Sequence, residues 1–435
     1  MAGIEGLAKL PELRKRILFT IALVAVYRIG VFVPVPGINI DELKIFMQMA
    51  QGTVFGVFNL FSGGAFQRFS IFSLGVAPYI SASIIVWLLQ NVVPHFEQLS
   101  KEGDLGKKRL TQYSRYGTIL LCLIQGYGIS LGLENIQVHG GGSPVIEPGL
   151  SFRLMTMLTL ATGTAFIMWL GERINEKGIG NGISMIIFSG IAADIPRGFM
   201  NSVQHIQSGE WSLMKFLVIL SFMVGAVAFI IFIESSERRI PIQQPRRVVG
   251  RKMYAGQSSY LPLKINNTGV YPPIFASSLL LFPATLATFV AIPFLGNLKG
   301  LLDSQSLGFN LLYVTLIVFF TYFFTAMQIK PEDTAENLKK GGGFIPGIRP
   351  GQNTADYVDY ILSRITLGGA IYLALVCVLP AFFYAKINAP FRFGGTSLLI
   401  LIGVALSTVQ QIQMYLLSRN YEGLMKDFKI QGRRG

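Results

Sequence analysis

The stretch FSGGAFQRFSIFSLGVAPYISASIIVWLLQ, from Phe61 to Gln90, decides how the rest of the chain is interpreted. Its second half belongs to an apolar run, Gly75–Val93, that is long enough to cross a membrane as a helix. Its first half is also apolar, but a helix over Asn59–Phe72 would rise only about 21 Å, too short for roughly 30 Å of hydrocarbon. Gly63 and Gly64 also loosen this helix. The sequence therefore places a short apolar segment that cannot span beside one that can.

The composition of the chain is that of a polytopic membrane protein. Of its 435 residues, 51% are hydrophobic and 14% are charged, whereas soluble domains carry about 25% charged residues. Hydropathy predicts an all-α fold with ten transmembrane helices, of which the fifth is short and is expected to end at Asp194. The predicted span cores are Ile17–Val33, Gly75–Val93, Ile119–Leu133, Leu154–Leu170, Ile183–Ile195, Phe216–Ile233, Val270–Ile292, Leu311–Met327, Ile365–Phe383 and Leu398–Leu417.

The distribution of positive charge predicts which side of the membrane each loop faces. Of 37 lysines and arginines, 28 fall in the two termini and one set of alternate loops, and eight fall in the opposite loops. By the positive-inside rule, both termini are expected in the cytoplasm. The net charge of +14 also predicts attraction to anionic lipids. No cleavage site follows the first span, so we expect no cleavable signal peptide.

Ionisable side chains are almost absent from the predicted spans, which argues against an ion-coupled pump and an intramembrane protease. Arg28 is the exception, and we expect it to snorkel to the interface or to find a partner. Gly178–Gly182 follows no strand and is expected to be a turn rather than a phosphate loop. Cys122 and Cys377 are expected to be packing residues, and the three histidines suggest no metal site. We therefore expect no cofactor, metal or catalytic site, and an energy source outside the chain.

The spans divide into two sets of five, which predicts two halves of opposite topology. The halves are residues 1–200, which contain the short apolar segment, and residues 201–435. An inverted repeat of this kind is also found in transporters of small solutes.

Two hydrophilic segments on the predicted cytoplasmic side are too long to be simple connections. Glu237–Gly269 has alternating runs that predict a β-hairpin. Lys330–Arg364 predicts a helix over PEDTAENLKK, a glycine-rich break, and a second helix with Thr354 as its N-cap. Ordered basic projections predict docking of a large acidic partner, protein or RNA. The residues expected to dock it are Arg246, Arg247, Arg251, Lys252 and Arg349.

The position of the short segment Asn59–Phe72, called the re-entrant segment below, predicts its role. It follows the first span, so it enters the membrane from the outside. A segment that enters the membrane without crossing it is tolerated only where its backbone is buried in protein or lines a cavity. We therefore expect a cavity open to the outside, with a detachable apolar lid in it.

Seven motifs, which cover nearly the whole chain in matching order, resemble the SecY family, the large subunit of the bacterial protein-conducting channel. They are VYRIGVFVPVPGI, FNLFSGGAFQRFSIFSLGVAPYISASIIVWLL, EGDLGKKRLTQYSRYGT, WLGERINEKGIGNGISMIIFSGI, GVYPPIFASSLLLFPAT, GGGFIPGIRPGQNTADY and FGGTSLLILIGVALSTVQQI. The resemblance implies ten helices in two pseudo-symmetric halves around an hourglass pore, and translocation of unfolded secretory polypeptides.

The resemblance also implies residues for each part of the channel. A short plug helix blocks the outer funnel, and the matching residues are Asn59, Phe61, Gly63, Gly64, Phe66, Phe69 and Phe72. The waist is a ring of aliphatic residues, matched by Ile80, Ile84, Ile183, Ile187, Ile274 and Ile400. A lateral gate between the second and seventh spans releases apolar segments into lipid, and Ser81, Ser83, Gln125 and Asn266 are the polar candidates.

The partners that the resemblance implies are the small membrane subunits SecE and SecG, the motor ATPase SecA, and the ribosome through its RNA and protein. Signal sequences and nascent polypeptides are the expected clients, and the plasma (inner) membrane is the expected location. Two rival functions are a secondary transporter, which needs polar groups at midplane, and an insertase or scaffold without a pore, which needs no plug or ring.

Overall fold

The computed structural model describes residues 11–49, 59, 62–135, 143–243, 247–249, 252–254, 259–289, 306–387 and 394–427. Each predicted span core overlaps a helix, although the first core runs three residues past the end of its helix and the last three residues of the seventh lie outside the described residues. These helices are α2 (Pro11–Gly30), α5 (Ala77–Val92), α7 (Asp104–Asn135), α8 (Leu150–Lys177), α9 (Gly182–Gln207), α10 (Leu213–Glu234), α11 (Tyr271–Phe289), α13 (Leu307–Gln328), α15 (Gln352–Ile387) and α16 (Gly395–Asp427).

Among the described residues, seven helices are long and apolar enough to cross a membrane on their own. An eighth span is formed if α5 is counted together with α6 (Pro94–Lys101), against which it bends by 96°. The prediction of a helical, multi-pass membrane protein is confirmed.

The prediction that the fifth span ends at Asp194 is wrong, because α9 continues through Pro196 to Gln207. Asp194 lies one turn before Arg197, and its carboxylate is 3.8 Å from the guanidinium. Such a pair at helical spacing partly compensates the charge within the helix. The charged residue therefore does not end the helix.

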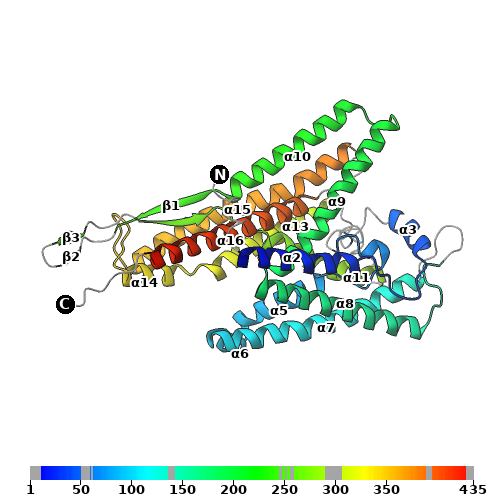
Figure 1. The fold of residues 1–435 in the computed structure, drawn as a ribbon, viewed down its shortest axis with the longest axis horizontal. Helices are drawn as coiled ribbons and strands as arrows, with labels where there is room; N and C mark the ends of the chain where they lie inside the picture. Colours follow the sequence, from blue (N-terminus) through cyan, green and yellow to red (C-terminus); the bar gives the residue numbers. More distant parts are fainter. Residues whose placement is uncertain are drawn as a thin grey trace. The chain divides into compact units, whose positions relative to one another are not determined.

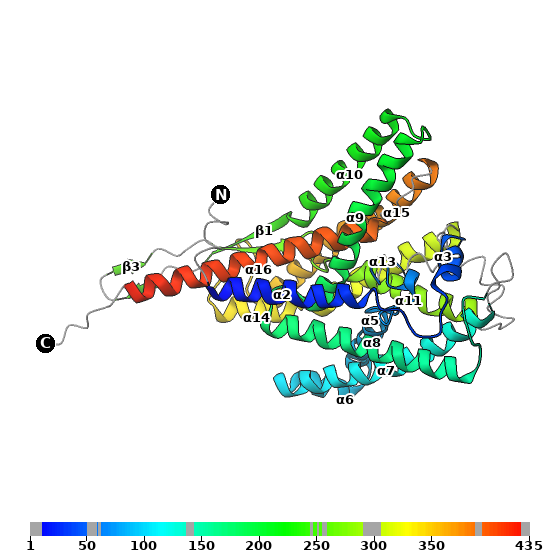
Figure 2. The same cartoon turned by 45° about the vertical axis from the view of Figure 1, so that its right-hand side comes forward.

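The chain divides into two compact units, each described here by itself. The first unit contains Met1–Phe199, Leu281–Ser306 and Ile400–Gly435, and the second contains Met200–Leu280 and Leu307–Leu399. In the first unit, α7 and α8 lie along each other, α5 packs on α7, and α2 packs on α8 (Figure 2). A Cβ on Gly126 of α7 would lie 3.3 Å from the Cα of Met157, so a small residue lets these two helices approach closely.

In the second unit, the predicted β-hairpin is confirmed. Strand β1 (Glu237–Ile242) continues from the end of α10 and pairs antiparallel with β4 (Ser259–Lys264). Strands β2 (Arg247–Val249) and β3 (Lys252–Tyr254) pair at the tip of the same projection (Figure 1). We call residues 237–264 the hairpin.

The second projection contains the two predicted helices, but the second one differs in detail. Helix α14 (Pro331–Lys340) has the predicted bounds. Helix α15 begins at Gln352 and runs without a break through the ninth predicted span. Thr354 is not an N-cap, because its hydroxyl donates a hydrogen bond back to the Arg349 carbonyl at 2.9 Å. The Gly351 carbonyl instead accepts the N–H groups of Thr354 and Ala355.

The hairpin packs on this second projection through an apolar core. Its buried residues are Ile240, Leu263, Ile345, Val358 and Leu362. A backbone bridge between Gln243 and Phe344 adds two hydrogen bonds of 2.9 Å. The hairpin and the start of α15 therefore form one packed body.

Candidate functional site

The re-entrant segment is folded mainly as turns rather than as the continuous short helix that the sequence predicts. Among the described residues, Asn59 is helical, residues 62–65 form turns, and Phe66–Arg68 form a 3₁₀ turn, η2. The reason lies in the backbone, since Gly63, Gly64 and Phe69 have φ angles of 62°, 83° and 45°. These left-handed conformations interrupt an α-helix. Of the predicted plug residues, Phe61 lies outside the described residues.

The polar side chains of the segment bind its own backbone. The Asn59 side-chain oxygen accepts the Gln67 N–H at 2.8 Å, and the Asn59 carbonyl accepts the Gly64 N–H at 2.8 Å. The Ser62 hydroxyl accepts the Phe66 N–H at 3.1 Å. Non-helical backbone at membrane depth needs such internal partners, because lipid supplies none. The segment is therefore a self-contained unit.

Three aromatic side chains of the segment are fully buried. Phe66, Phe69 and Phe72 have at most 2% of their surface exposed. The Phe72 ring stacks between Tyr27 and Phe166, with ring centroids 5.6 and 6.1 Å away. These contacts bury the aromatic surface of the segment against α2 and α8.

Helix α2 and the residues after it hold the segment by its backbone. The Tyr27 hydroxyl donates to the Ser62 carbonyl at 3.0 Å, and the Arg28 guanidinium donates to the Gly63 carbonyl at 3.0 Å. Beyond α2, the chain forms an antiparallel bridge between Pro34 and Ser70. The expectation that Arg28 finds a partner is confirmed, and that partner is the re-entrant segment.

Glycines let the surrounding helices approach the segment directly. A Cβ on Gly63 would lie 2.5 Å from the Cα of Gly190 on α9, a distance that backbone atoms cannot tolerate. A Cβ on Gly163 of α8 would overlap the Ile71 carbonyl. The segment is therefore seated by shape as well as by hydrogen bonds.

The predicted ring residues lie on four helices. In the first unit, Ile80 and Ile84 share one face of α5, Ile183 and Ile187 share one face of α9, and Ile400 lies on α16. In the second unit, Ile274 lies in the first turn of α11. All are buried except Ile183, which is half-buried and packs on Gly171 of α8.

The four predicted gate residues lie in different surroundings. Ser81 and Ser83 are half-buried on α5. Gln125 is buried on α7, and its side-chain oxygen has no hydrogen-bond partner among the described residues. Asn266 is buried between β4 and α11, where its amide donates to Glu234 at 2.7 Å and to the Gly269 carbonyl at 3.0 Å. Its oxygen accepts the Thr268 hydroxyl at 3.0 Å.

Only part of the predicted docking set falls on described residues. Arg246 and Arg251 lie outside them, whereas Arg247 and Lys252 lie on β2 and β3, opposite Tyr254 and Val249. Arg349 is exposed, and its carbonyl is fixed by the Thr354 hydroxyl.

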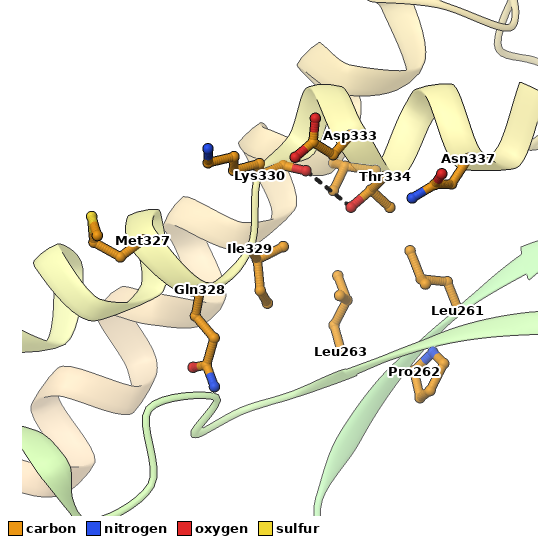
Figure 3. A pocket seen from close by; sticks show the side chains of 11 residues that line it. Leu261, Pro262, Leu263, Met327, Gln328, Ile329, Lys330, Asp333, Thr334 and Asn337 are labelled. Atoms are coloured by element: carbon orange, nitrogen blue, oxygen red, sulfur yellow. Dashed lines mark hydrogen bonds between the residues drawn. The ribbon is translucent and has the colours of Figure 1, made fainter. Parts of the chain in front are cut away.

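The sequence gives no sign of a pocket that lies at the base of the hairpin. It encloses about 520 Å³ and is lined by β4, the end of α13, the start of α14 and Val358 of α15. Leu261 and Leu263 point from β4 toward α14, which presents Asp333, Thr334 and Asn337 (Figure 3). Only a tertiary structure could show this pocket, because its walls come from segments that are far apart in the sequence.

Comparisons of the sequence with known proteins match it to the SecY family. The family model for SecY matches residues 70–409. The protein translocase subunit SecY of Aquifex aeolicus is 44% identical over 425 residues, which cover 97% of this chain and 99% of that protein. A solved structure described as a protein conducting channel has a TM-score of 0.67 at 16% identity, covering 94% of this chain and 96% of that one. Sec61 in a canine ribosome-channel complex, with the same coverage, has a TM-score of 0.61 at 16% identity. At such low identity, the structural likenesses show the fold alone.

Proposed function

The chain belongs to the SecY family of protein-translocation channels, and we propose that it passes unfolded secretory polypeptides across the bacterial plasma membrane and releases apolar segments sideways into lipid. We place both termini in the cytoplasm, because the positive charge is concentrated on that side. Residues 1–200 and 201–435 are the two pseudo-symmetric halves of the proposed channel.

The observation that carries this proposal is the seating of the re-entrant segment. The segment satisfies much of its own backbone, and α2 holds it through two side-chain hydrogen bonds, from Tyr27 and Arg28. The residues after α2 add two backbone hydrogen bonds, from the Val35 N–H to the Phe69 carbonyl and from the Ile71 N–H to the Val33 carbonyl. A segment held by this small set of bonds can leave as a unit once they break. In the proposed mechanism it is the plug that closes the channel toward the outside.

The second barrier in the proposal is the aliphatic ring formed by the six isoleucines named above. A narrow apolar constriction dewets and so hinders the passage of ions, while the plug completes the seal. Aliphatic side chains also offer no hydrogen bond or charge to a passing polypeptide. The ring therefore seals around an extended chain of any sequence without holding it.

Lateral release requires a seam that polar contacts keep closed only weakly. We assign Ser81, Ser83, Gln125 and Asn266 to this seam. The Gln125 side-chain oxygen has no hydrogen-bond partner among the described residues, whereas the Asn266 amide is bonded to Glu234 and to the Gly269 carbonyl within the second unit. Hydrogen bonds between membrane helices contribute about 1 kcal/mol each. Burial of an apolar signal sequence in lipid can outweigh a few of them.

The hairpin and the second projection provide the proposed docking face for a driving partner. Arg349 is exposed there, and the tip of the hairpin carries Arg247 and Lys252. Basic residues on an ordered scaffold suit the acidic surface of the motor SecA or the RNA of a ribosome. We assign the small membrane subunits SecE and SecG to the same complex.

Planar-bilayer conductance tests the proposed function. The purified chain with its small subunits is compared with a variant in which a Gly/Ser linker replaces Asn59–Phe72. We expect ion current in the variant and not in the intact channel, because the plug is gone. If both are silent, Ile80→Gly and Ile187→Gly are added to remove the ring. Continued silence of a correctly folded protein would contradict the channel function.

A further inference from the structure

The base of the hairpin brings the end of α10 and the start of α11 together. The β1–β4 register pairs Glu237 with Lys264, and the Ile265 N–H donates to the Ser236 carbonyl at 3.1 Å. After Ile265, only Asn266–Val270 separate the hairpin from α11. Any displacement of the hairpin therefore reaches these residues before it reaches the helix.

Glu234, the last residue of α10, is bound to this connection. One of its carboxylate oxygens, Oε1, accepts the Asn266 amide at 2.7 Å. The second N–H of that amide donates to the Gly269 carbonyl at 3.0 Å. The Asn266 side chain, which is only 4% exposed, thus has both of its donors occupied.

Helix α15 provides the support behind this pair. The Tyr372 hydroxyl donates to the same Glu234 oxygen at 3.3 Å. One turn earlier, a Cβ on Gly369 would lie 2.7 Å from the Ile265 carbonyl, so the connection lies directly on the backbone of α15. The Tyr372 ring also packs against Phe229 of α10, with the ring centroids 6.0 Å apart. The carboxylate therefore joins α10, α15 and the connection to α11 at one point.

The first turn of α11 follows from the position of Asn266. Gly269, which accepts from Asn266, has a φ of 60° and turns the chain into the helix. The Ile274 N–H then bonds to the Val270 carbonyl at 3.4 Å. Ile274, one of the proposed ring residues, thus lies one turn beyond a series of contacts that starts at Glu234.

We propose that Glu234 is a positioning residue that couples the hairpin to the first turn of α11 through the Asn266 amide. When a partner displaces the hairpin, this link passes the displacement to Ile274 and opens the pore. The inference rests on the proposed channel function, because it assigns the connection between docking and gating. A carboxylate suits this role, since a charged acceptor holds two donors more firmly than a neutral one.

The test separates binding of a partner from its effect on the channel. The chain and its small subunits are placed in proteoliposomes with SecA, ATP and an unfolded client that carries a signal sequence. SecA affinity and the rate of client translocation are measured for the wild type, Glu234→Ala and Glu234→Gln. The matched control is Glu176→Ala, at an exposed glutamate whose partner is Arg173.

We expect Glu234→Ala to lower the translocation rate by about tenfold, because it leaves a buried Asn266 donor without a partner. SecA affinity should stay within about twofold of the wild type, because the hairpin core does not include Glu234. Glu234→Gln should restore translocation to within about threefold, since its amide oxygen still accepts both hydrogen bonds. Glu176→Ala should match the wild type.

A double-mutant cycle with Asn266→Ala tests whether Glu234 acts through that residue. We expect the double variant to be no slower than Asn266→Ala alone, because the shared link is already lost. Fully additive losses would overturn the inference. So would wild-type translocation by Glu234→Ala, equal losses in Glu234→Ala and Glu234→Gln, or a parallel fall of SecA affinity and thermal stability. If instead the wild-type chain translocates nothing, it is the proposed function that fails.

Discussion

At the scale of single residues, the seating of the re-entrant segment depends on positions where no side chain fits. Gly63 and Gly190 meet backbone to backbone, and a Cβ on Gly190 would lie 2.8 Å from the Cα of Gly63. Gly63 also needs its left-handed backbone, with a φ of 62°. The re-entrant segment is therefore sensitive to the addition of a single methyl group, which hydropathy cannot register.

Gly190→Ala should displace the re-entrant segment and open the resting channel. Overpacking of this kind costs about 1–3 kcal/mol, and about 1.4 kcal/mol corresponds to a tenfold change in a population. We therefore expect the resting current in planar bilayers to rise by roughly tenfold. Gly225→Ala on α10 is the control, because nothing lies within 4 Å of its Cβ position. Equal currents in folded samples of both variants would contradict the seating described here.

Tyr27→Phe should weaken the attachment of the same segment without altering its packing. The variant keeps the ring that stacks on Phe72 and loses the donor to the Ser62 carbonyl. A lost hydrogen bond costs about 1 kcal/mol, so the displaced state should be about fivefold more populated. Single-channel open probability measures this change. Tyr116→Phe, at an exposed tyrosine, should leave the open probability unchanged.

At the scale of elements, the hairpin is held in place by the apolar core that it shares with the second projection. A two-stranded hairpin is marginally stable on its own in water. Here Ile240 and Leu263 pack on Ile345, Val358 and Leu362 from the second projection. The two proposed docking projections are therefore one folded body, and damage to one should affect the other.

Leu263→Ala should release the hairpin while the membrane helices stay folded. Leu263 is 4% exposed, and truncation of such a leucine costs about 2–5 kcal/mol. We expect limited proteolysis to cleave residues 237–264 at least tenfold faster than in the wild type. Tyr260→Ala, at a half-exposed position on β4, is the control and should be cleaved much less rapidly. Equal protection of the two variants would show that the core does not hold the hairpin.

At the scale of the whole molecule, we expect the distribution of charge to set the orientation in the membrane. The eight lysines and arginines of one side and the 28 of the other follow the alternation of the spans. Such a bias decides topology during insertion. In the proposed topology, the hairpin and α14 face the cytoplasm, where the proposed driving partner is available.

Thiol labelling of right-side-out membrane vesicles tests this orientation. Both native cysteines are buried, with Cys122 1% and Cys377 5% exposed, so they give little background. Ser208→Cys, in the exposed turn after α9, should react with a membrane-impermeant reagent at once. Glu332→Cys on α14 should react only after the vesicles are permeabilised. Labelling in the reverse order would overturn the proposed topology.

The sequence by itself determined the features that depend on local pattern. Hydropathy placed a helix at every predicted span, and alternation placed β1 and β4. The bounds of α14 followed from Pro331 at its start and glycines after Lys340. These signals are readable because spans, strands and caps are each specified by residues close together in the chain.

The tertiary structure alone decided what depends on residues far apart in the chain. It folded the re-entrant segment into turns against Gly190, and it gave Arg28 the Gly63 carbonyl as a partner. It carried α9 past Asp194 and joined Asn266 to Glu234. A hydrogen bond or a close backbone contact leaves no periodic trace in a sequence, because its energy depends on a neighbour that only folding brings near.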